Sequence, residues 1–240
     1  MNIFSKERNI IEDVQYYPLE PTDNNWIFFV LIAITGLLIY SRIGHGESYN
    51  KIMNSVLNNS IAKQLIRDQH ILVKKTIYLL NIIFVSTFAL LIYHISNHYS
   101  WNISYNGFLR YLIITVIITL VYFGRLILLK ILAFIFNLRP PVDEYIYYIT
   151  LSNNLYGFIL LPVIAILSFV DFGLYLPIFH VALVLTLLMY LHRYYKGLSI
   201  SSLHIKFHKF YFFIYLCAFE IIPWLIFYKI FKIFILTANT

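Results

Sequence analysis

Long apolar runs separated by short polar segments dominate the hydrophobic pattern of this 240-residue chain. A helix needs about 20 apolar residues to cross the roughly 30 Å hydrocarbon core of a bilayer. Six runs approach or exceed that length: 26–41, 76–96, 107–136, 149–170, 174–194 and 210–236. The pattern predicts an all-α, polytopic membrane protein with six transmembrane helices, in which residues 26–240 form one helical membrane domain.

The basic residues indicate how the predicted bundle is oriented. Lys and Arg gather in the first, third and fifth loops, whereas the second and fourth loops contain none. Because Lys and Arg accumulate in cytoplasmic loops, the odd-numbered loops are predicted to be cytoplasmic and both termini to lie outside. Residues 1–25 are acidic and lack the apolar core of a signal peptide, so they are expected to form a tail on the outer side.

The first loop has the pattern of an amphipathic helix over residues 48–72. Apolar residues recur there at helical spacing: Ile52, Met53, Val56, Leu57, Ile61, Leu65 and Ile66. Lys51, Lys63 and Arg67 lie among the polar positions. One interpretation is a cytoplasmic interfacial helix whose basic residues contact anionic lipid headgroups. The alternative is a helix that caps the bundle or binds a cytoplasmic protein.

Composition supports the membrane assignment and excludes several other classes. Hydrophobic residues make up 60% of the chain and charged residues only 12%, and a soluble domain cannot hide that much apolar surface. The net charge of +7 arises from residues that flank apolar runs, so nucleic acid is not an expected partner. Cys217 is the single cysteine, which excludes an intrachain disulfide and a multi-cysteine metal site.

A carboxylate, Glu220, lies near the middle of the last apolar run, three residues before Pro223. An acidic residue there costs about 2.5–3.5 kcal/mol on insertion scales, so it is expected to be protonated or paired. Arg125 lies at a comparable depth in the run 107–136, whereas Lys130 is about 140° away around the helix and can reach the interface. We predict an Arg125–Glu220 pair. It can fix helix register, serve a proton or ligand path, or contact another subunit, and Arg125 can alternatively reach the interface alone.

The histidines raise the question of a metal or haem. His94 and His180 both belong to the outer halves of their predicted helices, and two helices can supply the axial ligands of a haem. A polar cluster is also conceivable at the cytoplasmic side, formed by His192, Arg193, His204 and His208. Histidine is equally common as an ordinary interfacial residue, so no cofactor or metal is expected first. The chain contains no GxSxG, HExxH or glycine-rich phosphate-loop motif.

Residues 203–229, LHIKFHKFYFFIYLCAFEIIPWLIFYK, resemble the C-terminal signature of an uncharacterised family of multi-pass membrane proteins from Bacteroidetes. The shared stretch is YLCxxEIxP, here Tyr215, Leu216, Cys217, Glu220, Ile221 and Pro223. The resemblance covers most of the chain after the first run. It implies an inner-membrane location in a Gram-negative cell, so that the outer side is the periplasm. The family is a domain of unknown function, and the resemblance implies no reaction.

We therefore expect first a non-enzymatic inner-membrane subunit or scaffold of a larger cell-envelope assembly, with the bilayer and other membrane subunits as partners. One alternative is a transporter or proton-coupled carrier that uses Glu220 and Arg125, which predicts a polar cavity. Another is a membrane enzyme that acts on a lipid carrier, which predicts polar side chains converging at one interface. A dry, tightly packed bundle contradicts both alternatives.

Overall fold

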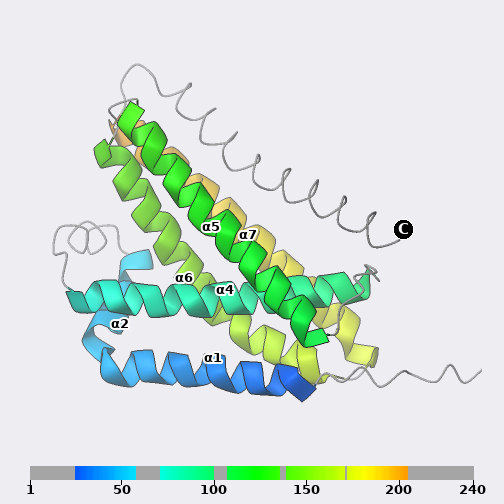
Figure 1. The fold of residues 1–240 in the computed structure, drawn as a ribbon. Helices are drawn as coiled ribbons and strands as arrows, with labels where there is room; N and C mark the ends of the chain where they lie inside the picture. The colour runs from blue at the N-terminus through cyan, green and yellow to red at the C-terminus, as the bar shows by residue number, and fades with distance from the viewer. Residues whose placement is uncertain (1–24, 58–70, 100–106, 136–138, 171, 205–240) are drawn as a thin grey trace, which may run out of the picture.

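The computed structural model describes residues 25–57, 71–99, 107–135, 139–170 and 172–204, and every regular element within these ranges is a helix. The elements are α1 (Asn25–Gly44), α2 (Gly46–Leu57), α4 (Ile71–His98), α5 (Gly107–Ile135), α6 (Arg139–Phe169) and α7 (Phe172–His204) (Figure 1). Five of these helices, α1 and α4 to α7, are long and apolar enough to cross a membrane. They correspond to the first five predicted spans, whereas the sixth, 210–236, and the acidic tail, 1–24, lie outside the described residues.

Two helices are longer than their apolar runs. α6 begins at Arg139 rather than near residue 149, with Pro140 and Pro141 in its first turn, where a missing N–H removes no helical hydrogen bond. α7 continues past residue 194 to His204. Hydropathy marks the part of a helix that is apolar, and these polar extensions continue the same helices beyond it.

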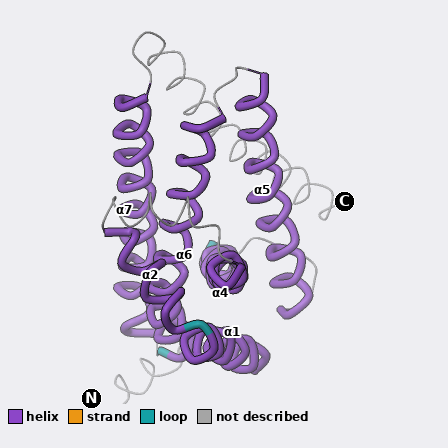
Figure 2. Tube along the Cα trace, turned by 90° about the vertical axis from the view of Figure 1, so that its left-hand side faces the viewer, coloured by secondary structure: helices purple, strands orange, loops and turns teal. Residues whose placement is uncertain are grey.

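Helix α4 is the centre of the bundle. Viewed along its axis, α1 lies against one side, α5 on another, and α6 with α7 on the side opposite α5 (Figure 2). α4 and α6 supply many of the most deeply buried side chains: Leu80, Ile83, Leu90, Leu91, Leu160 and Ile164. α1, α5 and α7 expose large apolar side chains such as Phe29, Leu120 and Leu187, as expected of faces that contact lipid.

The crossing of α4 and α6 requires a glycine. A Cβ atom placed on Gly157 would lie only 2.7 Å from the Cα atom of Phe84. Small residues allow membrane helices to approach this closely, so that van der Waals contacts replace the hydrophobic driving force that lipid cannot supply. The closeness of α4 to α6 therefore depends on this single position.

An aromatic cluster ties together the ends of three helices that lie far apart in the sequence. The ring of Trp26 at the start of α1 lies 5.1 Å from Tyr93, 5.3 Å from Tyr111 and 5.6 Å from Phe108. These partners belong to the end of α4 and the start of α5. Edge and tilted ring contacts of this kind stabilise the end of the bundle at which α1 begins.

Helix α2 lies over the first part of the predicted amphipathic segment. Its Tyr49, Ile52 and Ser55 are buried, and the helix packs against α4 and α6, while Lys51 is exposed. Burial raises the pKa of Tyr49 and nearby Arg42 lowers it, and the net result is a raised value. Tyr49 and Ile52 of α2 thus contact the chain itself. Residues 58–70, with Lys63 and Arg67, lie outside the described residues, so the interfacial helix stays a prediction.

Candidate functional site

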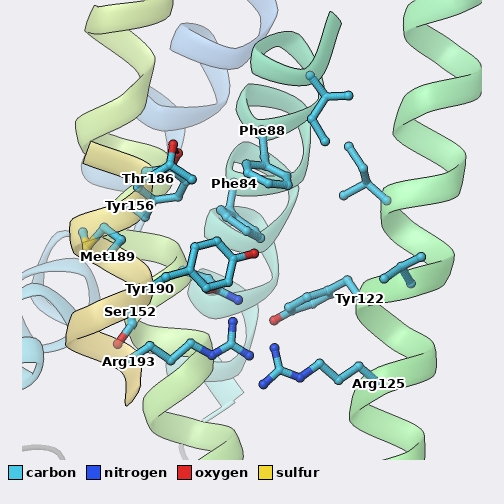
Figure 3. Close-up of a pocket in the computed structure, with 14 residues that line it drawn as sticks. Phe84, Phe88, Tyr122, Arg125, Ser152, Tyr156, Thr186, Met189, Tyr190 and Arg193 are labelled. Atoms are coloured by element: carbon cyan, nitrogen blue, oxygen red, sulfur yellow. Dashed lines mark hydrogen bonds between the residues drawn. The ribbon is translucent and has the colours of Figure 1, made fainter. Parts of the chain in front are cut away.

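A cavity of about 90 Å³ lies between α4, α5, α6 and α7, in the membrane-spanning part of the bundle (Figure 3). It is partly open. The lining residues are Phe84, Phe88 and Ile92 of α4; Ile118, Val121, Tyr122 and Arg125 of α5; Ser152, Asn153 and Tyr156 of α6; and Thr186, Met189, Tyr190 and Arg193 of α7. The described bundle is therefore not a dry, fully packed core.

Helices α5 and α7 present the same pattern to this cavity. Each contributes four residues at positions i, i+3, i+4 and i+7, which lie on one face of a helix. Each set ends in Tyr-x-x-Arg: Tyr122 with Arg125 on α5, and Tyr190 with Arg193 on α7. The two helices run in the same direction along the bundle, so the two Tyr-Arg pairs lie at matching depths (Figures 1 and 3).

The guanidinium groups of Arg125 and Arg193 point toward one another across the cavity (Figure 3). Arg193 is buried and Arg125 is partly buried. Two guanidinium groups that share one cavity repel each other. Two cationic groups on one cavity make it a candidate position for a negatively charged group, from the chain itself or from a ligand.

The wall between α6 and α7 is held by hydrogen bonds. The hydroxyl of Thr186 donates to the carbonyl oxygen of Ala182 at 2.7 Å, so its oxygen is the acceptor for the Tyr156 hydroxyl at 2.6 Å. Across the cavity, the Tyr122 hydroxyl donates a long hydrogen bond of 3.4 Å to Oδ1 of Asn81. These bonds orient the aromatic side chains that line the space.

Away from the arginines the cavity becomes apolar. The rings of Phe84 and Phe88 stack at 5.7 Å, and Tyr156 lies 6.1 Å and 6.2 Å from them. Ile92 and Ile118 line the same space, each farther along its helix from the level of the arginines. The site thus has a cationic end and an apolar end.

A third intramembrane arginine, Arg110, lies near the opposite end of α5. Its guanidinium donates to Oδ1 of Asn97 at 3.0 Å and to the hydroxyl of Ser96, and it lies 6.0 Å from the centre of the Tyr93 ring. These contacts join the start of α5 to the end of α4. Arg110 is not among the residues that line the cavity.

The predicted haem ligands lie apart from this site. Ser168 donates its hydroxyl hydrogen to the Ile164 carbonyl at 2.8 Å, so at 3.0 Å its oxygen accepts a hydrogen bond from Nε2 of His94. His180 is exposed, with Nδ1 2.7 Å from the carbonyl oxygen of Leu176. Within the described ranges, no three His, Cys, Asp or Glu residues are grouped to hold a metal ion. The haem prediction stays untested.

The structure brings together only part of the predicted site. Arg125 lines the cavity as a residue facing α7, while Lys130 is exposed on α5 and does not line it. Arg193 lines the cavity, while His192 is half-buried and absent from the lining, and the predicted cluster of His192, Arg193, His204 and His208 stays a prediction. His204 is the last residue of α7. Glu220, Cys217, Pro223 and His208 lie outside the described residues, so the Arg125–Glu220 pair stays a prediction.

Sequence reasoning missed the convergence of Arg125 with Arg193 and the aromatic residues around them. One signal was present: the stretches YFGR and YLHR place the same Tyr-x-x-Arg spacing in two apolar runs. The flanking His192 and Lys196 made Arg193 resemble an interfacial residue, although the helix buries it. The Thr186, Asn153 and Ser152 positions carried no such signal.

The fold and the cavity together define an all-helical protein with five helices long and apolar enough to cross a membrane and an arginine-lined cavity among them. The sequence model of the family named domain of unknown function DUF4271 matches residues 27–231, and the chain belongs to this family. The expected membership of an uncharacterised family is thereby confirmed, while its Bacteroidetes origin and the YLCxxEIxP stretch stay predictions. Neither curated proteins nor solved structures contain a match to the chain.

Proposed function

We propose that this protein is a membrane-embedded carrier that binds an oxyanion in the cavity between α4, α5, α6 and α7. The observation that carries the proposal is the pair Arg125 and Arg193, which face one cavity from two different helices. This corresponds to the transporter alternative more closely than to a scaffold, because helix packing alone does not need two facing cations beside an open volume.

The chemistry of the lining fits an oxyanion. A guanidinium is a planar donor that matches phosphate and carboxylate groups in a bidentate manner. The hydroxyl groups of Tyr122 and Tyr190 lie next to the two arginines in Figure 3. That of Tyr190 can donate to the same ligand, whereas that of Tyr122 already donates to Asn81. An anion bound there offsets the mutual repulsion of the cations in a medium where that repulsion is poorly screened.

Binding is favoured over bond-breaking chemistry by the same lining. Its charged members are both arginines, which remain protonated and serve as donors rather than as a general base. Glu220, the predicted partner of Arg125, supplies in this proposal a carboxylate that competes with the substrate for the arginine. Such competition gives a carrier a way to release a tightly held anion.

The topology is part of the proposal: six spans in a bacterial inner membrane, both termini in the periplasm, and residues 48–72 at the cytoplasmic surface. The helix ends that carry Arg42, Lys74 and Lys75 support a cytoplasmic location for that end of the bundle. Arg125 lies roughly 15 Å along α5 from Ile135, at the same end, and roughly 27 Å from Gly107. The anion site is therefore closer to the cytoplasmic side.

The test is thermal unfolding of the purified full-length protein in a neutral maltoside detergent, with chloride as the reference anion at equal ionic strength. Inorganic phosphate, acetate, decanoate and decyl phosphate serve as probes. We expect at least one oxyanion to raise the unfolding temperature of the unmodified protein and to have no effect on the double variant R125Q/R193Q. The variant R110Q, altered at the arginine outside the cavity, should respond like the unmodified protein.

Two results would contradict oxyanion binding at this site. One is that none of the four probes stabilises the unmodified protein. The other is an equal stabilisation of the R125Q/R193Q variant, which would place the anion elsewhere.

A further inference from the structure

We propose that the ligand is an amphiphile: a phosphate group held between Arg125 and Arg193, with an apolar chain that runs along α4 and α5 toward Ile92 and Ile118. This inference rests on the proposed function and names the class of its substrate. The supporting observation is the change in polarity along the cavity. Binding of a small soluble anion would need only the polar end.

The polarity changes in the same direction on two walls. Along α5 the lining passes from Arg125 through Tyr122 to Ile118, over roughly 10 Å of helix. α4 runs opposite to α5, so its lining passes from Phe84 at the polar end to Ile92 at the far end. Both walls therefore begin beside the arginines and end in branched aliphatic side chains.

The third wall, formed by α6 and α7, is less polar than its composition indicates. Tyr156 and Thr186 both line the cavity, but their hydroxyl groups bond to each other, and Thr186 bonds in turn to Ala182. A hydroxyl group that already donates its hydrogen does not need a hydrogen bond from the ligand. The ring of Tyr156 instead lies against Phe84 and Phe88, which extends the apolar surface.

The volume favours a ligand that is only partly enclosed. A space of about 90 Å³ suits a group of the size of a phosphate, and the cavity is partly open. Outside the lining, α5 and α7 carry exposed apolar residues such as Leu120 and Val184, which are expected to face lipid. A hydrocarbon chain longer than the apolar end can therefore continue into surroundings of the same polarity, which a charged or sugar-bearing tail cannot do.

Three probes applied to the detergent-solubilised protein distinguish a phosphate on an apolar chain from a free phosphate ion: decyl phosphate, inorganic phosphate and decanol. Each buried methylene contributes about 0.8 kcal/mol, so even two methylenes on the apolar wall make decyl phosphate bind about tenfold or more tightly than inorganic phosphate. Decanol, which lacks the anion, should not stabilise the protein. The readout is the probe concentration that gives half of the maximal rise in unfolding temperature.

A variant at the apolar end distinguishes a chain-binding wall from a general detergent effect. Ile118→Ser should weaken the binding of decyl phosphate much more than that of inorganic phosphate. Leu120→Ser changes the same helix on its exposed face, 67% exposed and outside the lining, and should alter neither.

The possible failures separate the two proposals. Equal half-maximal concentrations for decyl phosphate and inorganic phosphate would overturn the amphiphile and keep the oxyanion carrier. The same holds if Ile118→Ser and Leu120→Ser weaken decyl phosphate equally. Stabilisation by decanol as strong as that by decyl phosphate would also overturn the amphiphile. If neither phosphate stabilises the protein, the amphiphile proposal fails, and the proposed function survives only on the carboxylate probes.

Discussion

Helix α4 has two contrasting sides at the level of Phe84. On one side its backbone meets α6 so closely that only a glycine, Gly157, fits opposite it. On the other side the ring of Phe84 lines an open cavity with two arginines beyond it. The first contact leaves no room for a single added carbon atom, and the second leaves space for a ligand group. Because membrane helices are stabilised by close packing, the α4–α6 contact is the expected arrangement. The cavity on the other side of α4 is not, and it therefore requires an explanation.

The arginines repeat this contrast along α5. Arg110 uses its donors on Asn97 and Ser96 of the neighbouring helix end, so its contacts hold the bundle together. Arg125, on the same helix, faces Arg193 across a cavity. Two arginines of one helix thus have different surroundings, and burial or sequence context alone does not separate them.

The largest expected effect comes from filling the closed side. Gly157→Ala places a Cβ atom 2.7 Å from the Cα atom of Phe84, and overpacking of this kind costs about 1–3 kcal/mol of unfolding free energy. Because the contacted atom belongs to the backbone, a rotamer change cannot relieve it. The measurement is equilibrium unfolding of the full chain in mixed micelles.

Gly36→Ala is the matched control, because a Cβ atom at Gly36 in α1 would have nothing within 4 Å. Alanine is favoured over glycine in a helix by up to about 1 kcal/mol, so this variant should be neutral or stabilised. Equal effects of the two substitutions would show that the α4–α6 contact is not tight in solution.

A smaller effect is expected from changing the shape of a cation on the open side while keeping its charge. Arg193→Lys replaces a bidentate fork by a compact ammonium group. The weaker binding should raise the half-maximal concentration of the preferred oxyanion about tenfold. Arg110→Lys, outside the cavity, should change that concentration by less than about twofold, which is roughly 0.4 kcal/mol. A similar loss in both variants would mean that general electrostatics, rather than facing guanidinium groups, governs binding.

Much of the fold follows from the sequence because a bilayer imposes length and composition on each span. Five predicted runs correspond to described helices, since a run of apolar residues such as 107–136 has few other stable conformations in lipid. The polar extension of α6 back to Arg139 lies outside the apolar run, because hydropathy does not register helical residues that leave the apolar layer.

The site was less accessible to sequence reasoning. Arg125 stood out as a charge inside an apolar run, and this is a property of one segment. Its meeting with Arg193 depends on α5 and α7 lying on opposite sides of one space above α4, which no single run encodes. Likewise, Thr186 is an ordinary helix residue until the fold places it beside Tyr156. Local patterns therefore supplied a candidate residue, and tertiary packing supplied its surroundings.

The smallest effect tests whether the wall of the cavity is held by its hydrogen bond. Tyr156→Phe removes the donor to Thr186, whose own hydrogen is committed to Ala182. Interhelical hydrogen bonds in membranes average about 0.6 kcal/mol, so a loss of that size in unfolding free energy is expected. Tyr147→Phe is the control, because among the described residues the buried Tyr147 hydroxyl has no hydrogen-bond partner, and its removal should be neutral or stabilising. If Tyr156→Phe also proves neutral, Tyr156 is held by ring packing against Phe84 and Phe88 of α4 rather than by its bond to α7, and packing then stabilises both sides of α4.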